Sequence, residues 1–345
     1  MKDHITSLSL DEIKLFLQNI GEKSFRAIQI FDGIVNGKNL SEISTISTSL
    51  KQELLKQFED QTITIKTEIK GKSVTSKFIY ELCDKSLIEG VLMEYKHGKT
   101  LCVSTQVGCR MGCKFCASGK DGLIRNLTAG EILSQVLVVN KHIGGTKGKR
   151  EITNVVLMGS GEPLDNYDNV AKFLALVSSE EGLNVSQRNI SLSTCGMPEG
   201  IKKLIDDGFG VNLTISLHAP TDEKRKEIMS VAHAYSISEV IGASKKYFEK
   251  TKRRIIFEYA LIKNFNSSFE DAALLSKILK GLVCHVNLIP LNDSFDNGFC
   301  KAGRKESYAF CEKLNSLGIS ATVRRTLGDD IGGACGQLKS SYAGD

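Results

Sequence analysis

The chain has 345 residues, of which 41% are hydrophobic and 25% are charged, with ten cysteines and a formal net charge of +5. This composition is ordinary for a globular protein and excludes disordered and fibrous classes. No apolar run approaches the roughly 18–20 residues that span a bilayer, and the start, MKDHITSLSLDEIK, lacks the features of a signal peptide. We therefore expect a cytoplasmic protein with no membrane association, in which many cysteines indicate metal or redox chemistry rather than a disulfide framework.

Two accessory regions are predicted before residue 99. Residues 1–61 are expected to form a helical accessory domain, because apolar residues recur at helical spacing in three segments. From 62 to 98 the period of hydrophobicity changes to two, and the segments are separated by GKS and DKS, which are typical of turns. A small antiparallel sheet is the natural interpretation.

From 99 to 345 predicted strands alternate with predicted helices. Thr128 and Glu131 predict a capping box at the start of the first of these helices. Repeated strand–helix units indicate an α/β fold with a parallel sheet or barrel, whose ligand sites lie beyond the carboxyl ends of the strands. The predicted strands are 100–105, 152–159, 189–194, 211–217, 254–261, 284–289 and 320–325.

Three cysteines follow directly after the first of these strands, in the segment CRMGCKFC. Cys109, Cys113 and Cys116 are spaced four and three residues apart on one loop, so their thiolates can converge on a single iron–sulfur cluster. Three ligands would leave one iron open for a substrate or cofactor. The alternatives are a chance grouping and a zinc site, but zinc usually takes four ligands, and no second cysteine pair lies nearby.

This cysteine pattern, with the aromatic Phe115 before the third cysteine, resembles the radical S-adenosylmethionine (SAM) superfamily. The resemblance implies a partial (β/α)6 barrel and a [4Fe–4S] cluster whose open iron binds SAM. Reductive cleavage of SAM would then give a 5′-deoxyadenosyl radical, with the protein positioning the cofactor and excluding side reactions. An electron donor such as flavodoxin or ferredoxin is implied as a partner.

Six motifs in order from residue 101 to 338 are similar to the dual-specificity RNA adenine C2 methyltransferases, which act on 23S rRNA and tRNA. The resemblance covers nearly the whole chain. It implies that the products are 2-methyladenosine in the peptidyl transferase centre and in tRNA next to the anticodon, with two SAM molecules used per turnover. The motifs are LCVSTQVGCRMGCKFCASGKDGLIRNLTAGEI, MGSGEPLDN, ISLSTCG, LTISLHAP, HVNLIPLN and GDDIGGACGQL.

The resemblance assigns three reacting groups. Cys335 in ACGQL matches the cysteine that carries the methyl group as S-methylcysteine. Cys102 matches the thiol that resolves the covalent RNA adduct, because its attack on the Cys335 sulfur would release the RNA and leave a disulfide. Glu89 aligns with the family's proton acceptor; the alternative for Glu89 is a solvated strand carboxylate.

The resemblance also implies a set of SAM contacts at or just beyond strand ends. Gly161 and Glu162 of GEP would let the backbone approach the ligand and supply a carboxylate for its amino group. Taken alone, GEP would be a plain turn and a lone histidine would be structural. The remaining contacts implied are Ser193, Ser216, Leu217, His218 and Asn292.

Other functions stay open at this point. The sister enzymes that methylate adenine C8 share the cluster, both cysteines and the SAM site, although GEP and the RRTLGDDI segment favour C2. A non-catalytic iron–sulfur RNA-binding or electron-transfer protein is disfavoured by Cys335 within ACGQL, and a radical SAM enzyme for a small molecule is a further alternative. Ser160 departs from the family pattern, which usually has a larger apolar residue there.

Basic residues cluster in three places that are candidates for RNA contact. A charge run is most often a solvated face, but an RNA substrate needs lysine and arginine to offset its phosphates, and its target adenine must be unstacked. We expect the helical domain and the small sheet to grip the RNA, and nothing in the sequence demands more than a monomer. The basic clusters are 144–150, 245–254 and Arg324-Arg325.

Overall fold

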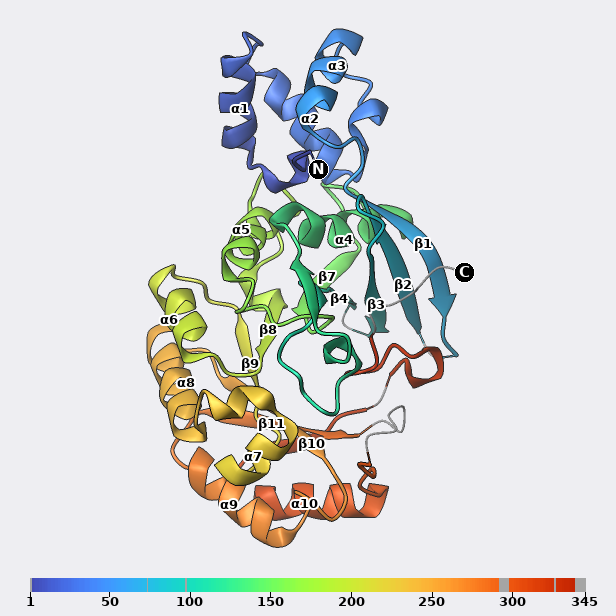
Figure 1. Cartoon of the computed structure of the whole chain (residues 1–345). Coiled ribbons are helices and arrows are strands. Elements are labelled where there is room, and N and C mark those ends of the chain that lie inside the picture. Colours follow the sequence, from blue (N-terminus) through green and yellow to red (C-terminus); the bar gives the residue numbers. More distant parts are fainter. Residues whose placement is uncertain (1, 73, 97, 292–297, 326, 339–345) are drawn as a thin grey trace.

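The computed structural model describes residues 2–72, 74–96, 98–291, 298–325 and 327–338. In this part of the chain, one curved sheet has the strand order β1-β2-β3-β4-β7-β8-β9-β10-β11-β12 (Figure 1). Within this sheet, neighbouring strands are parallel from β4 through β7 to β12, as the strand–helix alternation predicts. The bounds are β1 (Ile63–Lys70), β2 (Thr75–Leu82), β3 (Leu87–Tyr95), β4 (Gly98–Cys102), β7 (Ile152–Leu157), β8 (Ile190–Thr194), β9 (Asn212–Ser216), β10 (Ile255–Leu261), β11 (Cys284–Pro290) and β12 (Ala321–Val323).

Helices follow the parallel strands and cover the outer side of the curved sheet (Figure 1). Six strand–helix units from β4 to α10 followed by β12 make the partial (β/α)6 barrel that was predicted. Among the described helices, none combines the length and apolar character that crossing a bilayer requires. The bounds are α4 (Ala129–His142), α5 (Tyr167–Ser178), α6 (Pro198–Asp206), α7 (Asp222–Ile228), α8 (Ile237–Thr251), α9 (Phe269–Leu279) and α10 (Arg304–Ser316).

The predicted antiparallel strands β1, β2 and β3 are present, and they continue the barrel sheet instead of forming a separate layer. β1 pairs with β2 and β2 with β3, all antiparallel. β3 then pairs antiparallel with β4, which places Val91 opposite Cys102. Because directly opposed residues share a face of the sheet, the cysteine expected to resolve the RNA adduct faces the same side as alternate residues of β3.

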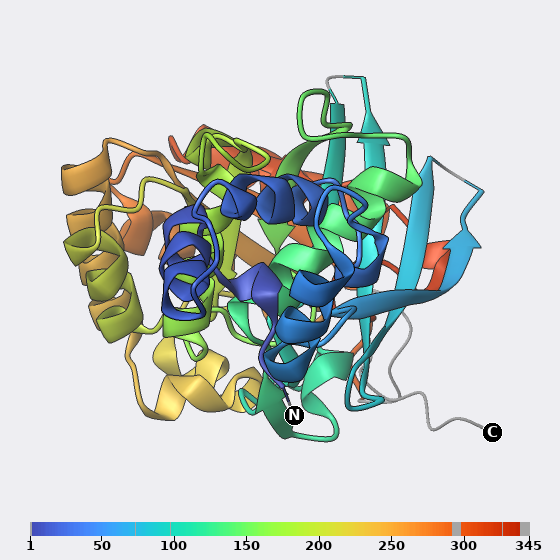
Figure 2. The same ribbon diagram turned by 90° about the horizontal axis from the view of Figure 1, so that it is seen from above.

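Three short helices form the N-terminal region, as expected: α1 (Leu10–Asn19), α2 (Arg26–Val35) and α3 (Thr48–Gln57). Ser9 and Glu12 form a capping box at the start of α1, and the Ser47 hydroxyl caps α3. The three helices lie at the end of the molecule opposite α9 and α10 (Figure 1), and in the view from above they lie in front of the rest of the chain (Figure 2).

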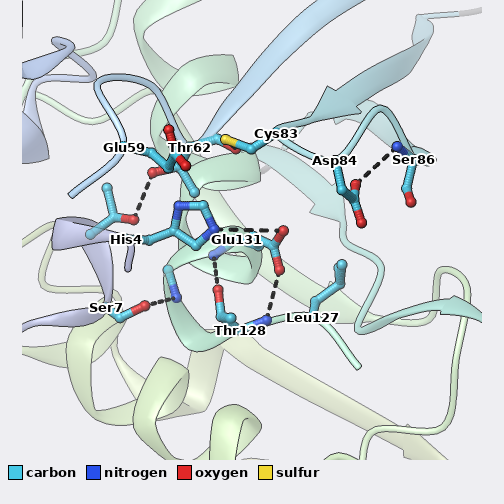
Figure 3. A network of polar contacts seen from close by, with 12 residues as sticks. His4, Ser7, Glu59, Thr62, Cys83, Asp84, Ser86, Leu127, Thr128 and Glu131 are labelled. Atoms are coloured by element: carbon cyan, nitrogen blue, oxygen red, sulfur yellow. Dashed lines mark hydrogen bonds and ion pairs between the residues drawn. The ribbon is translucent and has the colours of Figure 1, made fainter. Parts of the chain in front are cut away.

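Buried polar contacts anchor the N-terminal segment to the start of α4 (Figure 3). Thr128 and Glu131 form the predicted capping box, and the Ser7 hydroxyl accepts a hydrogen bond from a backbone amide in the first turn of α4. The Arg125 guanidinium donates to the two carboxylate oxygens of Glu131 at 2.8 and 2.9 Å. His4 lies 3.8 Å from Glu131, and burial lowers the pKa of its imidazole. The helical region is therefore tied to the barrel by specific bonds as well as by apolar packing.

Candidate active site

The loop with the three predicted cluster cysteines projects from the end of β4 and is closed at its base by a short hairpin. β5 (Gln106–Gly108) pairs antiparallel with β6 (Leu123–Asn126). Gly108 has a φ of +77°, and a Cβ there would lie 2.0 Å from the Gly122 carbonyl oxygen, so only glycine fits. Sequence analysis missed this hairpin, because strands of three and four residues are too short to show a period of two.

A large cavity opens between this loop and the carboxyl ends of the barrel strands; we call it the cofactor cavity. Its empty space, including the part open to solvent, is about 920 Å³. Cys109, Cys113 and Cys116 line one part of it. Its apolar wall includes Leu157, Met158, Met229, Ile289 and Leu291, and its polar wall includes Glu162, Ser193, Ser216, His218 and Glu258.

The three thiols fit an iron–sulfur cluster better than a single metal ion. Among the described residues, no three His, Cys, Asp or Glu side chains converge closely enough to hold one ion, whereas the ligands of a cluster bind different irons and need not meet at one point. Burial raises the pKa of Cys109 to about 12 and raises the pKa of Cys113 and Cys116 as well. These thiols therefore need a bound cation to become thiolates at neutral pH.

The GEP segment after β7 contributes backbone and a buried carboxylate to the cofactor cavity. Gly161 has a φ of +106°, and a Cβ there would lie 2.6 Å from the Gln106 Cβ, so a larger residue would displace Gln106. The Glu162 carboxylate accepts hydrogen bonds from the backbone amides of Leu164 at 3.0 Å and Cys195 at 2.7 Å. Burial raises the pKa of Glu162, and the lone pairs left over can accept from a ligand ammonium group.

Hydrogen bonds join the GEP segment to the cysteine loop. The Gln106 side chain accepts from the Glu162 amide at 2.8 Å and donates to Asp165 at 2.9 Å. Asp165 in turn accepts from Arg110, the residue after the first cysteine, at 2.9 Å. Ser160, the departure from the family pattern, is fully buried, and its hydroxyl donates to the Gly108 carbonyl oxygen at 3.4 Å. The substitution is thus accommodated by an added bond between the two loops.

His218 is held rigidly in the cavity wall as a neutral ring. Its Nδ1 accepts a hydrogen bond from the Ala260 amide at 2.9 Å, so the proton of the neutral imidazole is on Nε2. The ring packs edge-on against Phe115 of the cysteine loop at 4.7 Å between centroids. Burial lowers the pKa of His218 to about 3. The ring can therefore donate one hydrogen bond throughout the physiological pH range.

A second cavity of about 630 Å³ adjoins the first; we call it the thiol cavity. Cys102 and Cys335 both line it, and Cys335 also lines the cofactor cavity. Neither thiol is in a disulfide. Burial raises the pKa of Cys102 to about 12. Desolvation of the sulfur also raises the pKa of Cys335, although that residue as a whole is exposed, and the positive charge of Arg324 acts in the opposite direction. The other lining residues include Val91, Met93, Tyr95, Met158, Arg324 and Arg325.

The C-terminal segment that contains Cys335 is bonded to the cysteine loop. The Gly336 carbonyl oxygen accepts from the Ala117 amide at 2.8 Å, and the Leu338 carbonyl oxygen accepts from the Ser118 hydroxyl, also at 2.8 Å. Figure 1 shows this red segment running beside the teal loop. Cys335 is thus fixed beside the cluster cysteines although it is far from them in sequence.

Two predicted site residues, Glu89 and Leu217, are not among the residues that line the cavities, and a third lies outside the described part of the chain. Glu89 is 1% exposed and forms an ion pair with Lys77 at 2.9 Å. It is therefore not the solvated carboxylate that was the alternative to a catalytic role. It faces the same side of β3 as Val91, which lines the thiol cavity. Leu217 is fully buried and lies next to His218. Asn292 lies outside the described residues.

Sequence analysis missed Glu258, which lies in the wall of the cofactor cavity and pairs with Arg324 of the thiol cavity at 3.0 Å. The available signal was a single charged residue inside the apolar strand IIFEYAL. A carboxylate in a strand buried on both faces needs a partner or a function, and that argument alone could have identified it.

Comparisons with known proteins agree with this geometry. Residues 103–275 match the model of the radical SAM superfamily, whose members are expected to bind a 4Fe–4S cluster and SAM. The probable dual-specificity RNA methyltransferase RlmN of Clostridium botulinum (strain Eklund 17B) is 52% identical over 344 residues, which cover 98% of this chain and 97% of the relative. That of Clostridium perfringens (strain 13) is 50% identical over 345 residues, with coverage of 98% and 97%. The crystal structure of a radical SAM methyltransferase from Sphaerobacter thermophilus has a TM-score of 0.93 and 37% identity, with coverage of 98% and 99%. The chain belongs to the RlmN family of radical SAM RNA methyltransferases.

Proposed function

We propose that this protein makes 2-methyladenosine in 23S rRNA and in tRNA, with Cys335 as the carrier of the methyl group. The observation that carries the proposal is the position of Cys335, which lines both the cofactor cavity and the thiol cavity. A residue at this boundary can take a methyl group from SAM on one side and present it to a base on the other.

Cys109, Cys113 and Cys116 would hold the [4Fe–4S] cluster, and with SAM bound the cluster would supply a 5′-deoxyadenosyl radical. Glu162 would accept hydrogen bonds from the SAM ammonium group, and the glycine before it lines the same cavity. Ser193, Ser216 and His218 line the same cavity, and His218 presents one N–H. Leu217 and Asn292 would complete the contacts that the family resemblance implies.

Cys102 would resolve the covalent adduct between RNA and Cys335. Attack of the Cys102 thiolate on the Cys335 sulfur forms a disulfide and breaks the bond from sulfur to the transferred carbon, which takes a proton to become the methyl group. Both thiols line one cavity, as this step requires. Glu89, on the same face of β3 as Val91, would accept the proton removed from adenine C2, with Lys77 holding its carboxylate at 2.9 Å.

The accessory regions 1–61 and 62–98 would grip the RNA, while residues 99–345 would hold the cluster, SAM and both reacting thiols. The strands β1 to β3 extend the sheet beside the thiol cavity, so they can contact RNA while a flipped adenine reaches Cys335. Arg325 is exposed at the same cavity and can contact a phosphate. An electron donor such as flavodoxin or ferredoxin would reduce the cluster.

The test uses anaerobically reconstituted protein, SAM labelled in its methyl group, a reductant and unmodified 23S rRNA fragment or tRNA. Mass spectrometry of the digested nucleosides should show labelled 2-methyladenosine for the wild type and for Cys300→Ala, which removes an exposed thiol outside both cavities. Cys335→Ala should give none. Labelled 8-methyladenosine would refute the C2 assignment, and cleavage of SAM with no methylated adenosine would refute the RNA substrates.

A further inference from the structure

Arg225 on α7 is the largest side chain that the described part of the chain buries completely, with 0% of its surface exposed. Arginine is almost never buried to this extent unless an acidic partner compensates its charge. The guanidinium stays protonated in a protein, so a full positive charge lies in the interior next to the barrel. Neither the parallel sheet nor the proposed methyl transfer explains why it is there.

The hydrogen bonds of Arg225 in the described residues go to backbone carbonyl oxygens and to no carboxylate. Its Nη2 donates to Cys195 at 2.5 Å, its Nε to Leu217 at 3.2 Å and its Nη1 to Tyr235 at 3.3 Å. Asp222, three residues earlier in the helix, instead accepts a hydrogen bond from the Ile237 amide at 2.7 Å. The guanidinium therefore satisfies its N–H groups, but its charge is balanced only by carbonyl dipoles.

The uncompensated charge lies behind the cysteine end of the cofactor cavity. Cys195, whose carbonyl oxygen Arg225 holds, lines this cavity together with Cys113. The carboxyl end of α7 is bonded to the cysteine loop, because the Ile228 carbonyl oxygen accepts from the Lys114 amide at 3.0 Å. Burial raises the pKa of Cys113, and the positive charge of Arg225 acts in the opposite direction. The cation is thus close enough to influence a negative charge that develops at this cysteine.

A buried cation without an anion is costly, and an iron–sulfur cluster bound by three thiolates would supply negative charge beside it. Reduction by a one-electron carrier of low potential adds one electron, and therefore one further negative charge, to the cluster. Charges interact strongly where water is excluded, so a fixed positive charge stabilises the reduced cluster more than the oxidised one. Nearby charge and solvent exposure are the factors by which proteins set the potentials of such clusters.

We propose that Arg225 is the buried counter-charge of the cluster and raises its reduction potential, so that the electron needed for cleavage of SAM is accepted more easily. The inference rests on the proposed cluster site at Cys109, Cys113 and Cys116. Because Arg225 also holds the backbone after β8 and β9, the experiment has to separate the effect of its charge from that of its hydrogen bonds.

Two variants make this separation. Arg225→Lys keeps the charge and gives up the forked guanidinium, whereas Arg225→Gln keeps an N–H donor and removes the charge. The midpoint potential is measured by redox titration of the cluster-containing protein without SAM, followed by the EPR signal of the reduced cluster. In Arg225→Gln the equilibrium constant for reduction should fall at least about tenfold, which is about 59 mV for one electron. Arg225→Lys should stay within about 3-fold of the wild type, because the charge remains.

Arg150→Gln is the matched control. Arg150 also donates to backbone carbonyl oxygens, those of Leu183 at 3.0 Å and Asn184 at 2.9 Å, but it precedes β7, at the end of the barrel away from the cofactor cavity. Its potential should equal that of the wild type.

An unchanged potential in Arg225→Gln would overturn the inference. So would a potential in Arg225→Lys as low as that of Arg225→Gln, since the loss would then come from the hydrogen bonds. Each variant decides by itself if the other does not fold, because the glutamine variant has to fall and the lysine variant has to match the wild type. Absence of the EPR signal from the reduced wild type would overturn the proposed cluster site itself, and the inference with it.

Discussion

Replacing Lys77 by methionine should destabilise the protein strongly, because it leaves the carboxylate of Glu89 buried without its cation. Both side chains are almost completely buried, 7% and 2% exposed, and their charged atoms are 2.9 Å apart. Breaking a buried ion pair by removing one partner costs about 3–5 kcal/mol. The variant also loses the bond from Lys77 to the Gly332 carbonyl oxygen, at 3.4 Å. We therefore expect the free energy of unfolding to fall by about 3–5 kcal/mol.

Thermal unfolding followed by circular dichroism measures the effect. For 345 residues the unfolding entropy is about 0.7 kcal/mol/K, so the loss corresponds to a decrease in Tm of about 4–7 °C. The double variant Lys77→Met/Glu89→Gln should recover most of this decrease, because neither ionisable side chain of the pair then remains buried.

Lys99→Met is the control, because its pair with Glu151 is 26% and 30% exposed and should contribute less than about 1 kcal/mol. A Tm for Lys77→Met no lower than that of Lys99→Met would refute the reasoning. A double variant no more stable than Lys77→Met would also refute it, because the loss of stability would then not come from the buried Glu89 carboxylate.

Three other outcomes follow from the site. Cys102→Ala should still form the bond between RNA and Cys335 but not release it, so a covalent RNA–protein adduct should persist on denaturing gels; free methylated RNA at the wild-type rate would contradict this. The ring of His218, whose pKa is lowered to about 3, should show no titration by NMR between pH 5 and 8. Because the pKa of His218 in the folded protein is below its ordinary value of 6.5, the free energy of unfolding should fall progressively as pH falls from about 6.5 toward 3. Gly161→Ala places a Cβ 2.6 Å from Gln106 and should weaken S-adenosylhomocysteine binding at least tenfold by calorimetry, about 1.4 kcal/mol; unchanged affinity would show that the loop adjusts freely.

The elements with strong local signals were predicted correctly from the sequence. Apolar strands separated by amphipathic helices predict the parallel barrel, and Thr128 with Glu131 predicts the start of α4. The cysteine spacing predicts a shared loop, and the three cysteines do line one cavity. These features succeed because periodicity and capping are properties of neighbouring residues.

The features that sequence analysis missed depend on contacts between distant residues. The hairpin of β5 and β6 involves segments too short to show a pattern. The continuity of β3 with β4 turns an apparently separate sheet into the edge of the barrel. Glu258 belongs to the cofactor cavity only because β8, β9 and β10 bring its carboxylate beside two serines. Side chains on different elements meet only in the folded chain, so spacing along the sequence gives no indication of them.

The bonds between the cysteine loop and the Cys335 segment also have a consequence for the order of assembly during translation. Ser118 and Leu338, which join the two segments, are 220 residues apart in the chain. A chain made from its N-terminus at about 5–20 residues per second reaches the second segment at least roughly 10 s after the first. The cysteine loop thus lacks its bonds to the later segment for that interval. Iron and sulfide delivered in this interval meet a loop that is less constrained than in the finished protein, where two hydrogen bonds join it to the Cys335 segment.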